Sequence, residues 1–516
     1  MTPTPPPAPR GMVASQHHLA VDAALTMLDA GGTAADAAVA AAAVLTVVDP
    51  RSTGLGGDLF ALYWAPGADA PTGLEAVGTA PAGLTPDAIR AAGHTRMPVD
   101  GPWSITTPGA PAGWTTLLER YGKLDVATVL DPAIRLARDG FVVSAAVADE
   151  WTGAVAKLTR DEAATATFLP GGRPPTAGET FALPDLADTL ETFAAHGADP
   201  FYRGPLAERI GEAVQRLGGP LTAEDLAAWT GPRWVTPLSV RFRDLDVWEM
   251  PPPGQGLVVL QALATLHGLD VGDVVTQDHQ AIEALKWAFA DANDHIADPD
   301  LADVDVDRLL SDDHLAERRR QIADGVVVEA DVGRPSDTVY VAVADDEGGS
   351  CSFIQSVYDG FGSGVVVPGT GMALQNRGSG FVLRDGHPNA PAPGKRPYHT
   401  IIPSMLSRDG AFVGCMGVVG GYMQPQGQVQ VLRNLTDRRM TAQEACDAPR
   451  FRVYRGREVA LEDGYAPTTR EGLAARGHDL PPLHPHERGG AQLVLRTDDG
   501  YVGGSDHRKD GVARGR

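Results

Sequence analysis

The stretch DTVYVAVADDEGGSCSFIQSVYDGFGSG, residues 337–364, decides the fold of this chain. Two runs of alternating residues flank an acidic, glycine-rich break, and this pattern predicts a β-hairpin. If the turn centres on Glu347, Thr338 on the first strand lies opposite Ser356 on the second, with Cβ atoms about 5.5 Å apart on one face. A slip of one residue would move Ser356 to the other face. The pairing of the two hydroxyls therefore depends on this register.

Thr338 has two interpretations. It is either a β-branched residue in a strand, where such residues are favoured, or a nucleophile that a cut between Asp337 and Thr338 would expose. The cut would free an α-amino group with a pKa of about 8, which could act as the general base for the hydroxyl. Because short motifs give many false matches, the hairpin residues taken alone favour the ordinary strand residue.

The composition excludes several classes of protein. The chain has 516 residues and a net charge of −23, and an acidic surface repels phosphate backbones, so we expect no nucleic-acid partner. Hydrophobic residues make up 43% and charged residues 21%, which is a normal globular balance. The cysteines, Cys351, Cys415 and Cys446, are widely spaced. They predict neither a disulfide framework nor a zinc motif.

The amino-terminal residues and the apolar stretches indicate a location. Residues 1–10 are rich in proline and predict a disordered lead without the apolar region of a secretory signal. Residues 34–48 are the longest apolar stretch but are too short for a bilayer, which needs about 20 residues. This stretch is better interpreted as a buried helix. We therefore expect a soluble, cytoplasmic protein with no membrane partner.

Helical patterns dominate the chain up to about residue 325, and short strands follow. This order predicts an α+β fold in which two helical layers enclose antiparallel sheets. Asp131 before Pro132 indicates a helix start, and Thr222 with Asp225 has the spacing of an N-cap and its third residue. We expect helices at 17–30, 34–48, 132–139, 183–196, 206–217, 222–229, 277–297 and 306–323, and strands at 59–64, 240–249, 338–344, 350–358, 381–384, 411–417 and 491–502.

Clusters of glycine and of acidic residues are candidate sites for a phosphate, an oxyanion or a metal ion. Residues 360–364 resemble a phosphate-cradling loop, but no helical pattern follows them, so we expect no nucleotide cofactor. Residues 417–421 follow a strand, and their N–H groups could form an oxyanion hole or simply end that strand. His295 lies among aspartates, as is typical of a solvated helix end in an acidic protein. We expect neither a metal nor another cofactor.

Beyond the hairpin, the chain resembles the γ-glutamyltransferase (glutathione hydrolase) family of the N-terminal-nucleophile hydrolases. The resemblance implies a four-layer αββα sandwich, made as one precursor that cuts itself before a threonine. It would leave a large-subunit region, residues 11–337, and a small-subunit region, residues 338–516, which stay associated as one fold. The motifs that carry the resemblance lie at 11–15, 31–40, 54–57, 250–253, 337–381, 420–421 and 503–506.

The resemblance also assigns roles to residues. It implies that Asp337 and Thr338 flank the cut, that Thr338 is the nucleophile, and that Ser356 is a helper hydroxyl. Gly420 and Gly421 would hold the oxyanion with their N–H groups. This assignment agrees with the hairpin register and overturns the preference for an ordinary strand residue.

Several positions that bind the γ-glutamyl group in this family differ here. Val77 stands where the family has a carboxylate-binding arginine, and Gly380 stands where it has an acid that binds the ammonium. Losing both anchors removes charge-assisted bonds worth about 1.5–3 kcal/mol each. Arg377 could contact a carboxylate from a new direction. The resemblance implies substrate-binding positions at Tyr358, Asn376, Arg377, His399 and Thr400, where Tyr358 replaces the family's asparagine and His399-Thr400 replaces its Ser-Ser pair.

The leading hypothesis is an autoprocessed threonine amidohydrolase or acyltransferase that acts on a small amide or γ-glutamyl-type molecule, with weak or absent glutathione hydrolysis. The alternative is an unprocessed, catalytically silent scaffold or binding protein of the same fold. It gains support because Thr338-Val339-Tyr340 replaces the family's usual Thr-Thr-His.

Overall fold

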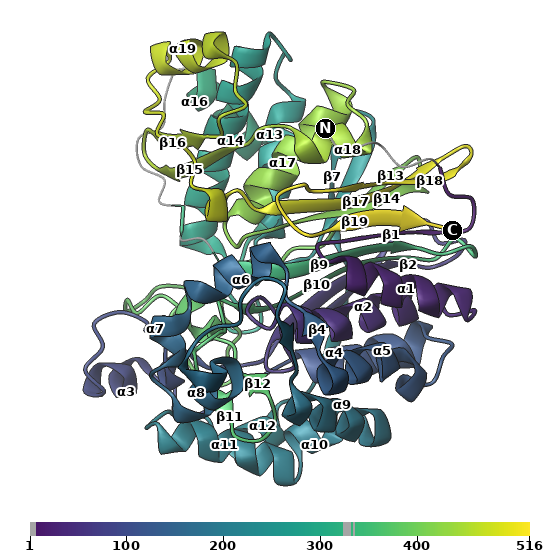
Figure 1. The fold of residues 1–516 in the computed structure, drawn as a ribbon. Coiled ribbons are helices and arrows are strands. Elements are labelled where there is room, and N and C mark those ends of the chain that lie inside the picture. Colours follow the sequence, from purple (N-terminus) through teal and green to yellow (C-terminus); the bar gives the residue numbers. More distant parts are fainter. Residues whose placement is uncertain (1–6, 324–331, 334–335) are drawn as a thin grey trace.

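The computed structural model describes residues 7–323, 332–333 and 336–516. The predicted hairpin lies in the middle of a seven-stranded antiparallel sheet (Figure 1). The strands of this sheet, in spatial order, are β19 (Val512–Gly515), β1 (Met12–Ser15), β9 (Asp337–Ala344), β10 (Ser350–Tyr358), β2 (Asp58–Trp64), β3 (Thr72–Ala76) and β6 (Arg233–Val235). Both strands of the hairpin therefore have a hydrogen-bonded neighbour on each side.

A second antiparallel sheet of six strands packs on the first, and β14 and β17 contact β9 directly. Its order is β18 (Gly500–Ser505), β17 (Gly490–Thr497), β14 (Ala411–Val419), β13 (Ser404–Arg408), β8 (Leu245–Glu249) and β7 (Leu238–Phe242). Short two-stranded pairs complete the strand content: β4 (Phe141–Val142) with β5 (Thr180–Phe181), β11 (Val366–Val367) with β12 (Met372–Ala373), and β15 (Phe451–Arg455) with β16 (Glu458–Leu461).

The alternation along β9 explains why it is buried on both faces. Val339, Val341 and Val343 belong to a core that the first sheet shares with helices, whereas Tyr340 and Ala342 belong to the core between the two sheets. Successive strand residues point to opposite faces, so one strand contributes to two hydrophobic cores. An analogous third core joins the outer face of the second sheet to other helices.

Helices cover the outer face of each sheet (Figure 1). On the first sheet lie α1 (His18–Asp29) and α2 (Ala34–Val48), and on the second lie α13 (Gly256–His267) and α17 (Met423–Thr436). Helix α14 (Val274–His295) packs against α13 and α17. The remaining helices are α3 (Pro86–Ala91), α4 (Ala110–Tyr121), α5 (Val126–Asp139), α6 (Ala145–Thr152), α7 (Val155–Leu158), α8 (Glu162–Phe168), α9 (Pro184–His196), α10 (Asp199–Tyr202), α11 (Pro205–Arg216), α12 (Ala223–Ala228), α15 (Val306–Leu309), α16 (Asp312–Ala323), α18 (Ala442–Asp447) and α19 (Pro467–Ala475), with 3-10 turns at 102–104, 170–172, 377–380 and 485–487.

The mixed helix and sheet content predicted from the sequence is confirmed. Every residue of α2 is buried, as expected for an apolar helix between layers. Thr33 and Asp36 form a capping box at its start, which satisfies backbone N–H groups that a helix end leaves free. The predicted pair of Thr222 and Asp225 also forms a capping box, at α12. No helix among the described residues combines the length and apolar character that crossing a membrane requires.

Several expected boundaries are wrong. Helix α5 begins at Val126 with Asp125 as its cap, so Pro132 lies inside the helix and Asp131 does not start it. The expected strand at 240–249 is the hairpin of β7 and β8, and Arg243 turns the chain with a φ of 57°. The stretch 491–502 likewise divides into β17 and β18, and 306–323 divides into α15 and α16.

Two further expectations, the strand at 381–384 and the disordered lead at 1–10, are wrong where backbone hydrogen bonds hold the chain in another arrangement. Residues 381–384 form no strand, because the Arg384 amide bonds back to the Val382 carbonyl and the Val382 amide bonds to Asn389. Residues 1–6 lie outside the described residues. The disordered lead expected over residues 1–10 is wrong at Ala8, which is buried and exchanges backbone hydrogen bonds with Tyr501.

Candidate active site

The hairpin has the register that the sequence predicts. Val339 pairs with Gln355, and the pairs that follow toward the turn keep the same register, centred on Glu347. Thr338 is buried, and its Oγ1 lies 3.4 Å from Ser356 Oγ. Beyond Gln355 the register shifts, and Tyr358 takes a φ of 81°. The two hydroxyls therefore face each other where the regular register of the hairpin ends, within the distorted part of β10.

Both hydroxyls are directed at one carbonyl group. Thr338 Oγ1 and Ser356 Oγ each donate a hydrogen bond of 2.6 Å to the carbonyl oxygen of Asp337. Ser356 Oγ in turn accepts a bond of 2.7 Å from the Tyr358 amide. A donor on a carbonyl oxygen stabilises negative charge that develops there when the carbon is attacked. The peptide bond between Asp337 and Thr338 is therefore polarised by the residue that faces Thr338 across the hairpin.

Gln424 holds the threonine hydroxyl from the second sheet's side. Its Nε2 donates to Thr338 Oγ1 at 3.1 Å, and its Oε1 accepts from the Ile402 amide at 3.0 Å. Because the amide side chain is fixed at both ends and fully buried, it leaves Thr338 Oγ1 with its proton directed at the Asp337 carbonyl.

Gly420 and Gly421 connect β14 to α17 next to the same peptide bond. Their φ values of 115° and 61° favour glycine. A Cβ on Gly421 would lie 2.1 Å from Ser336 Oγ, so the chain before Asp337 runs directly against this turn. Their carbonyl oxygens accept hydrogen bonds from the backbone amides of Met423 and Gln424 at the start of α17. Neither glycine N–H donates to any described residue. The two N–H groups are therefore open for an oxyanion.

Two cavities adjoin this site. The smaller, about 180 Å³, is lined by Thr338, Asp337 and Gly420. The larger, about 880 Å³, does not include Thr338 but shares Asp149 and Glu150 with the smaller one. The space beside the peptide bond thus suits a small molecule, and the large cavity opens next to it.

A chain of ion pairs holds the side chain of Asp337. Arg51 Nη1 lies 2.6 Å from Asp337 Oδ1 and 3.0 Å from Glu150 Oε2, and Lys509 Nζ lies 2.7 Å from Glu150 Oε1. Burial raises the pKa of the Asp337 carboxyl, and Arg51 opposes that rise. Burial and Glu150 raise the pKa of the neighbouring Asp49 to about 7. The residue before the peptide bond is therefore fixed by charges from three distant parts of the chain.

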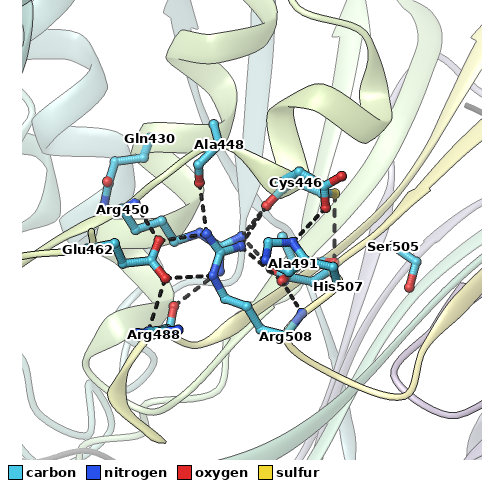
Figure 2. A network of polar contacts seen from close by, with 12 residues as sticks. Gln430, Cys446, Ala448, Arg450, Glu462, Arg488, Ala491, Ser505, His507 and Arg508 are labelled. Carbon is cyan, nitrogen blue, oxygen red and sulfur yellow. Dashed lines mark hydrogen bonds and ion pairs between the residues drawn. The ribbon is translucent and has the colours of Figure 1, made fainter. Parts of the chain in front are cut away.

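The segment 506–509 contains Lys509, the lysine of these ion pairs. A buried network of polar side chains holds this segment in place (Figure 2). Asp506 accepts from Arg450 at 2.6 Å and from Arg508 at 3.0 Å. Arg508 also makes a two-pronged pair with Glu462, at 2.6 and 2.8 Å, which is the strong geometry for arginine and a carboxylate. The segment 506–509 is thus a structural anchor beside the site.

Arg377 lies on the other side of the hairpin's distorted end. Its guanidinium carbon is 4.2 Å from the centre of the Tyr358 ring, and its Nη1 donates to Thr400 Oγ1 at 2.9 Å. Arg377 is fully buried, and its Nε and Nη2 have no hydrogen-bond partner among the described residues. Three of the expected substrate-binding residues are thus brought together.

The other two expected binding residues are engaged by the protein. Asn376 Nδ2 donates to the Val99 carbonyl at 2.7 Å. His399 is fully buried, with Nδ1 2.7 Å from the Pro397 carbonyl oxygen and Nε2 3.1 Å from Asp58 Oδ2. Burial lowers the pKa of His399. Both ring nitrogens already have partners, so this ring supports the site rather than presenting a nitrogen to it.

Comparison with known proteins shows which family the chain belongs to. The family model for gamma-glutamyltranspeptidase matches residues 20–515. The chain belongs to the gamma-glutamyltranspeptidase family. It is 37% identical to the oxamate amidohydrolase proenzyme of Klebsiella pneumoniae over 98% of each chain, and 31% identical to the glutathione hydrolase proenzyme of Escherichia coli over 97% of this chain and 91% of that one. The crystal structure of cephalosporin acylase from Bacillus halodurans superposes with a TM-score of 0.94 at 41% identity, covering 100% of this chain and 98% of that chain.

The chain belongs to a family of enzymes, and the resemblance compared Val77 and Gly380 with residues that bind substrate in that family. Val77 is buried in the core between the sheets. A Cβ on Gly380 would lie 2.6 Å from the Tyr398 carbonyl oxygen. The backbone at Gly380 therefore approaches its neighbour too closely for a side chain to be added there without rearrangement.

A buried group of side chains with metal-ligand chemistry lies on α14 and before the end of the chain, apart from His295 and its neighbouring aspartates. Ligand atoms of His279, Glu283 and His478 lie within 4.8 Å of one another. However, Lys286 Nζ donates to Glu283 Oε1 at 2.8 Å, and the two histidine rings bond to each other at 2.8 Å. Burial lowers the pKa of both histidines, to about 4 for His279 and about 3 for His478. The ammonium already balances the carboxylate, so a cation would have to displace it.

Sequence reasoning missed Gln424 and the ion-pair chain of Arg51, Glu150 and Lys509. For Gln424 the sequence does carry a signal, because residues 424–430 have a glutamine at every second position. All four glutamines are buried. A buried helix rich in glutamine must use those amides as hydrogen-bonding groups. The ion pairs gave no local signal, since they join residues 99 to 359 positions apart.

Replacing Ser356 tests the role of the second hydroxyl. Ser356→Ala removes a 2.6 Å donor from the Asp337 carbonyl, and loss of one such donor slows reactions of this type about 100- to 1000-fold. We expect the self-cleavage that the family resemblance implies to slow by about this factor. The rate is measured from the appearance of fragments on a denaturing gel over time. The control is Ser352→Ala on the same strand, whose hydroxyl bonds to Tyr340 instead. Equal rates in the two variants would contradict this role.

Proposed function

We propose that the chain is a proenzyme that cuts itself between Asp337 and Thr338, and that the product is a threonine-nucleophile amidohydrolase and acyltransferase. The observation that carries the proposal is the Asp337 carbonyl oxygen, which accepts from the Thr338 and Ser356 hydroxyls at 2.6 Å each. Supporting it, the curated relatives named above are both described as proenzymes.

The cut would proceed through an ester. Thr338 Oγ1 attacks the carbonyl carbon of Asp337 and loses its proton, while Ser356 donates to the carbonyl oxygen. The C–N bond then breaks, and the nitrogen takes up a proton to become the α-amine of Thr338. Water hydrolyses the ester that remains between Asp337 and Thr338 Oγ1. The products are a carboxylate on Asp337 and a free hydroxyl and amine on Thr338.

The same hydroxyl would then act on a substrate. The new α-amine, with an ordinary pKa of about 8, takes the proton of Oγ1 as the oxygen attacks an amide carbonyl. The open N–H groups of Gly420 and Gly421 hold the oxyanion. Collapse expels the amine, which takes the proton, and leaves an acyl ester on Thr338. Water or a second amine resolves this ester.

The substrate is a small amide in this proposal. The cavity at Thr338 is about 180 Å³, and the anchor positions Val77 and Gly380 carry no charge. An ordinary γ-glutamyl group would therefore bind weakly, and we expect little glutathione hydrolysis. The relatives include proteins named for oxamate and for cephalosporin, which supports a changed acyl group within the family.

We also infer that the layers described above form the four-layer αββα sandwich of the N-terminal-nucleophile hydrolases. The order of helices, sheet, sheet and helices supports this inference, and so does the position of Thr338 at the start of a central strand.

The test is intact-mass measurement of purified protein, followed by amide hydrolysis. We expect masses for residues 1–337 and 338–516, and release of ammonia from oxamate faster than glutamate from glutathione. An intact chain of 516 residues would contradict the proposal and favour a silent scaffold. Robust glutathione turnover would contradict the changed specificity alone.

A further inference from the structure

Arg51 joins the residue before the proposed cut to the end of β10. Its Nη1 lies 2.6 Å from Asp337 Oδ1. Its backbone carbonyl accepts from the Phe361 amide at 2.8 Å, and the carbonyl of Ser52 accepts from the Val357 amide at 3.3 Å. The backbone of this segment is therefore bonded at two points around the distorted end of β10, and the Arg51 side chain reaches from there to Asp337.

The two hydroxyl groups do not by themselves orient the carbonyl that is to be attacked. The hydrogen bonds from Thr338 and Ser356 both end on the Asp337 carbonyl oxygen. Bonds that end on one atom fix its position but not the direction of the carbon behind it. Attack requires the reacting atoms to lie about 3–3.5 Å apart with their orbitals aligned. A further attachment on the same residue fixes that direction, and the Asp337 side chain provides it through Arg51.

The pair of Arg51 and Asp337 is largely shielded from solvent. The two side chains are 18% and 17% exposed, so salt screens their attraction less than that of surface pairs. Glu150 also contacts Arg51, at 3.0 Å, but Lys509 lies 2.7 Å from Glu150. The second cation offsets the charge of Glu150, which keeps the guanidinium available for Asp337.

We propose that Arg51 is a positioning residue for the self-cleavage, and that it turns the Asp337 carbonyl carbon toward Thr338 Oγ1 by holding the Asp337 carboxylate. This inference rests on the proposed function, because the cut is its first step. The ion pairs that join Arg51, Glu150 and Lys509 to their partners span 99 to 359 positions of the chain. The alignment is therefore complete only after these distant segments have docked, and the cut waits for the fold.

The first measurement follows the rate of the cut in newly made protein. The full-length chain is synthesised in a cell-free system with a labelled amino acid, and its two fragments are resolved over time on a denaturing gel. We expect Arg51→Gln to slow the cut about 100-fold, since misplacing a reacting group by about 1 Å costs that much. Arg51→Lys should recover part of the rate, because it keeps the charge. A cut of Arg51→Gln at the unmodified rate would overturn the inference.

Arg318→Gln is the matched control. Arg318 pairs with Asp291 at 2.5 Å, and these side chains are 14% and 8% exposed, so the pair resembles that of Arg51 in chemistry and burial. It joins α16 to α14 in the helical layer outside the second sheet (Figure 1). Both variants should lower the midpoint of urea unfolding, while only Arg51→Gln should slow the cut. Equal slowing in the two would indicate lost stability rather than lost alignment, and would contradict the role of Arg51.

A double-mutant cycle separates the ion pair from other effects of each substitution. Asp337→Asn keeps the shape of the side chain but removes the charge that Arg51 holds. If the two residues act through their pair, the double variant should be cut no more slowly than Arg51→Gln alone, because one interaction can be lost only once. Losses that add in the double variant would count against the proposal.

The pH profile gives a readout that stability alone would not move. Burial raises the pKa of the Asp337 carboxyl, and Arg51 opposes that rise. As pH falls through this pKa, the carboxyl takes up a proton and becomes like the neutral amide of Asp337→Asn. The rate advantage of the unmodified chain over that variant should therefore shrink from about pH 8 to about pH 4, and a constant advantage would exclude the proposed role.

The charged groups that face this carboxyl or its partners are present in both chains, so their own titration largely cancels in the comparison. They are Arg51 and Asp49 beside the end of α2, Glu150 on α6, Asp359 after β10, and Lys509. If Arg51→Gln does not fold, the pH profile of the folded chains decides. If the unmodified chain is never cut, the proposed function itself has failed. If it is cut and Arg51→Gln is cut equally fast, only the role of Arg51 has failed.

Discussion

Thr338→Ala protein is expected to run as one full-length band on a denaturing gel, where the unmodified chain gives two fragments. The substitution removes the oxygen that bonds to the Asp337 carbonyl at 2.6 Å, and with it the group that would attack that carbon. Ser356 remains in place but faces the carbonyl oxygen, so it cannot take over without a change of backbone. We expect no cleavage over days, and no amide hydrolysis by the uncut protein.

The matched control is Thr338→Ser, which keeps the hydroxyl and loses the methyl group that fixes its rotamer. Cleavage should persist at a reduced rate, and the amino-terminal residue of the smaller fragment should be serine. Fragments of Thr338→Ala cut at the same peptide bond would show that a separate protease makes the cut.

Asp506→Asn is expected to destabilise the protein more than any surface change. Asp506 is fully buried and pairs with Arg450 and Arg508, and removing one partner of a buried pair costs about 3–5 kcal/mol because the other charge is left uncompensated. Urea unfolding should show this as a lower midpoint. The control is Asp131→Asn, whose exposed pair with Arg135 is worth less than about 1 kcal/mol.

The pH dependence of this difference follows from the pKa of Asp506. Burial alone would raise it, but Arg450 and Arg508 outweigh burial and lower it to about 2. A lowered pKa contributes stability above the unfolded value of about 4 and loses it as pH falls toward 2. The contribution is about 2 kcal/mol. The gap between the unmodified protein and Asp506→Asn should therefore narrow below pH 4, and a gap that widens there would contradict the assignment.

The sequence predicted the hairpin register because its determinants are local. Alternating residues and a glycine-rich turn fix which side chains face each other, so the approach of Thr338 to Ser356 needed no tertiary information. The hairpin of β7 and β8 was missed because its turn, at Arg243, lacks the glycine or asparagine that usually marks one. The turn between β17 and β18 did carry the signal Asp499-Gly500.

The rest of the site depends on contacts between distant segments. Arg51 and Asp337 are 286 positions apart, and Lys509 and Glu150 are 359 apart, so nothing in either neighbourhood indicates the pair. The open edge of Arg377 is likewise a property of packing, since Asp58 accepts from the amides of Gly78 and Gly109 and makes no ion pair with Arg377 among the described residues. Motifs locate the reacting group, whereas folding decides which charges surround it.

The strand order of the two sheets has a consequence for what the cut can release. In the first sheet, β1 lies between β19 and β9, and β10 lies beside β2, so strands from before and after Asp337 interleave. In the second sheet, β13, which follows Asp337 in the sequence, pairs with β8, which precedes it. The proposed cut of one peptide bond would therefore free an amine but no polypeptide. Each half has unsatisfied strand edges without the other, so we expect the chain to fold before such a cut, and two separately made halves would expose those edges to aggregation.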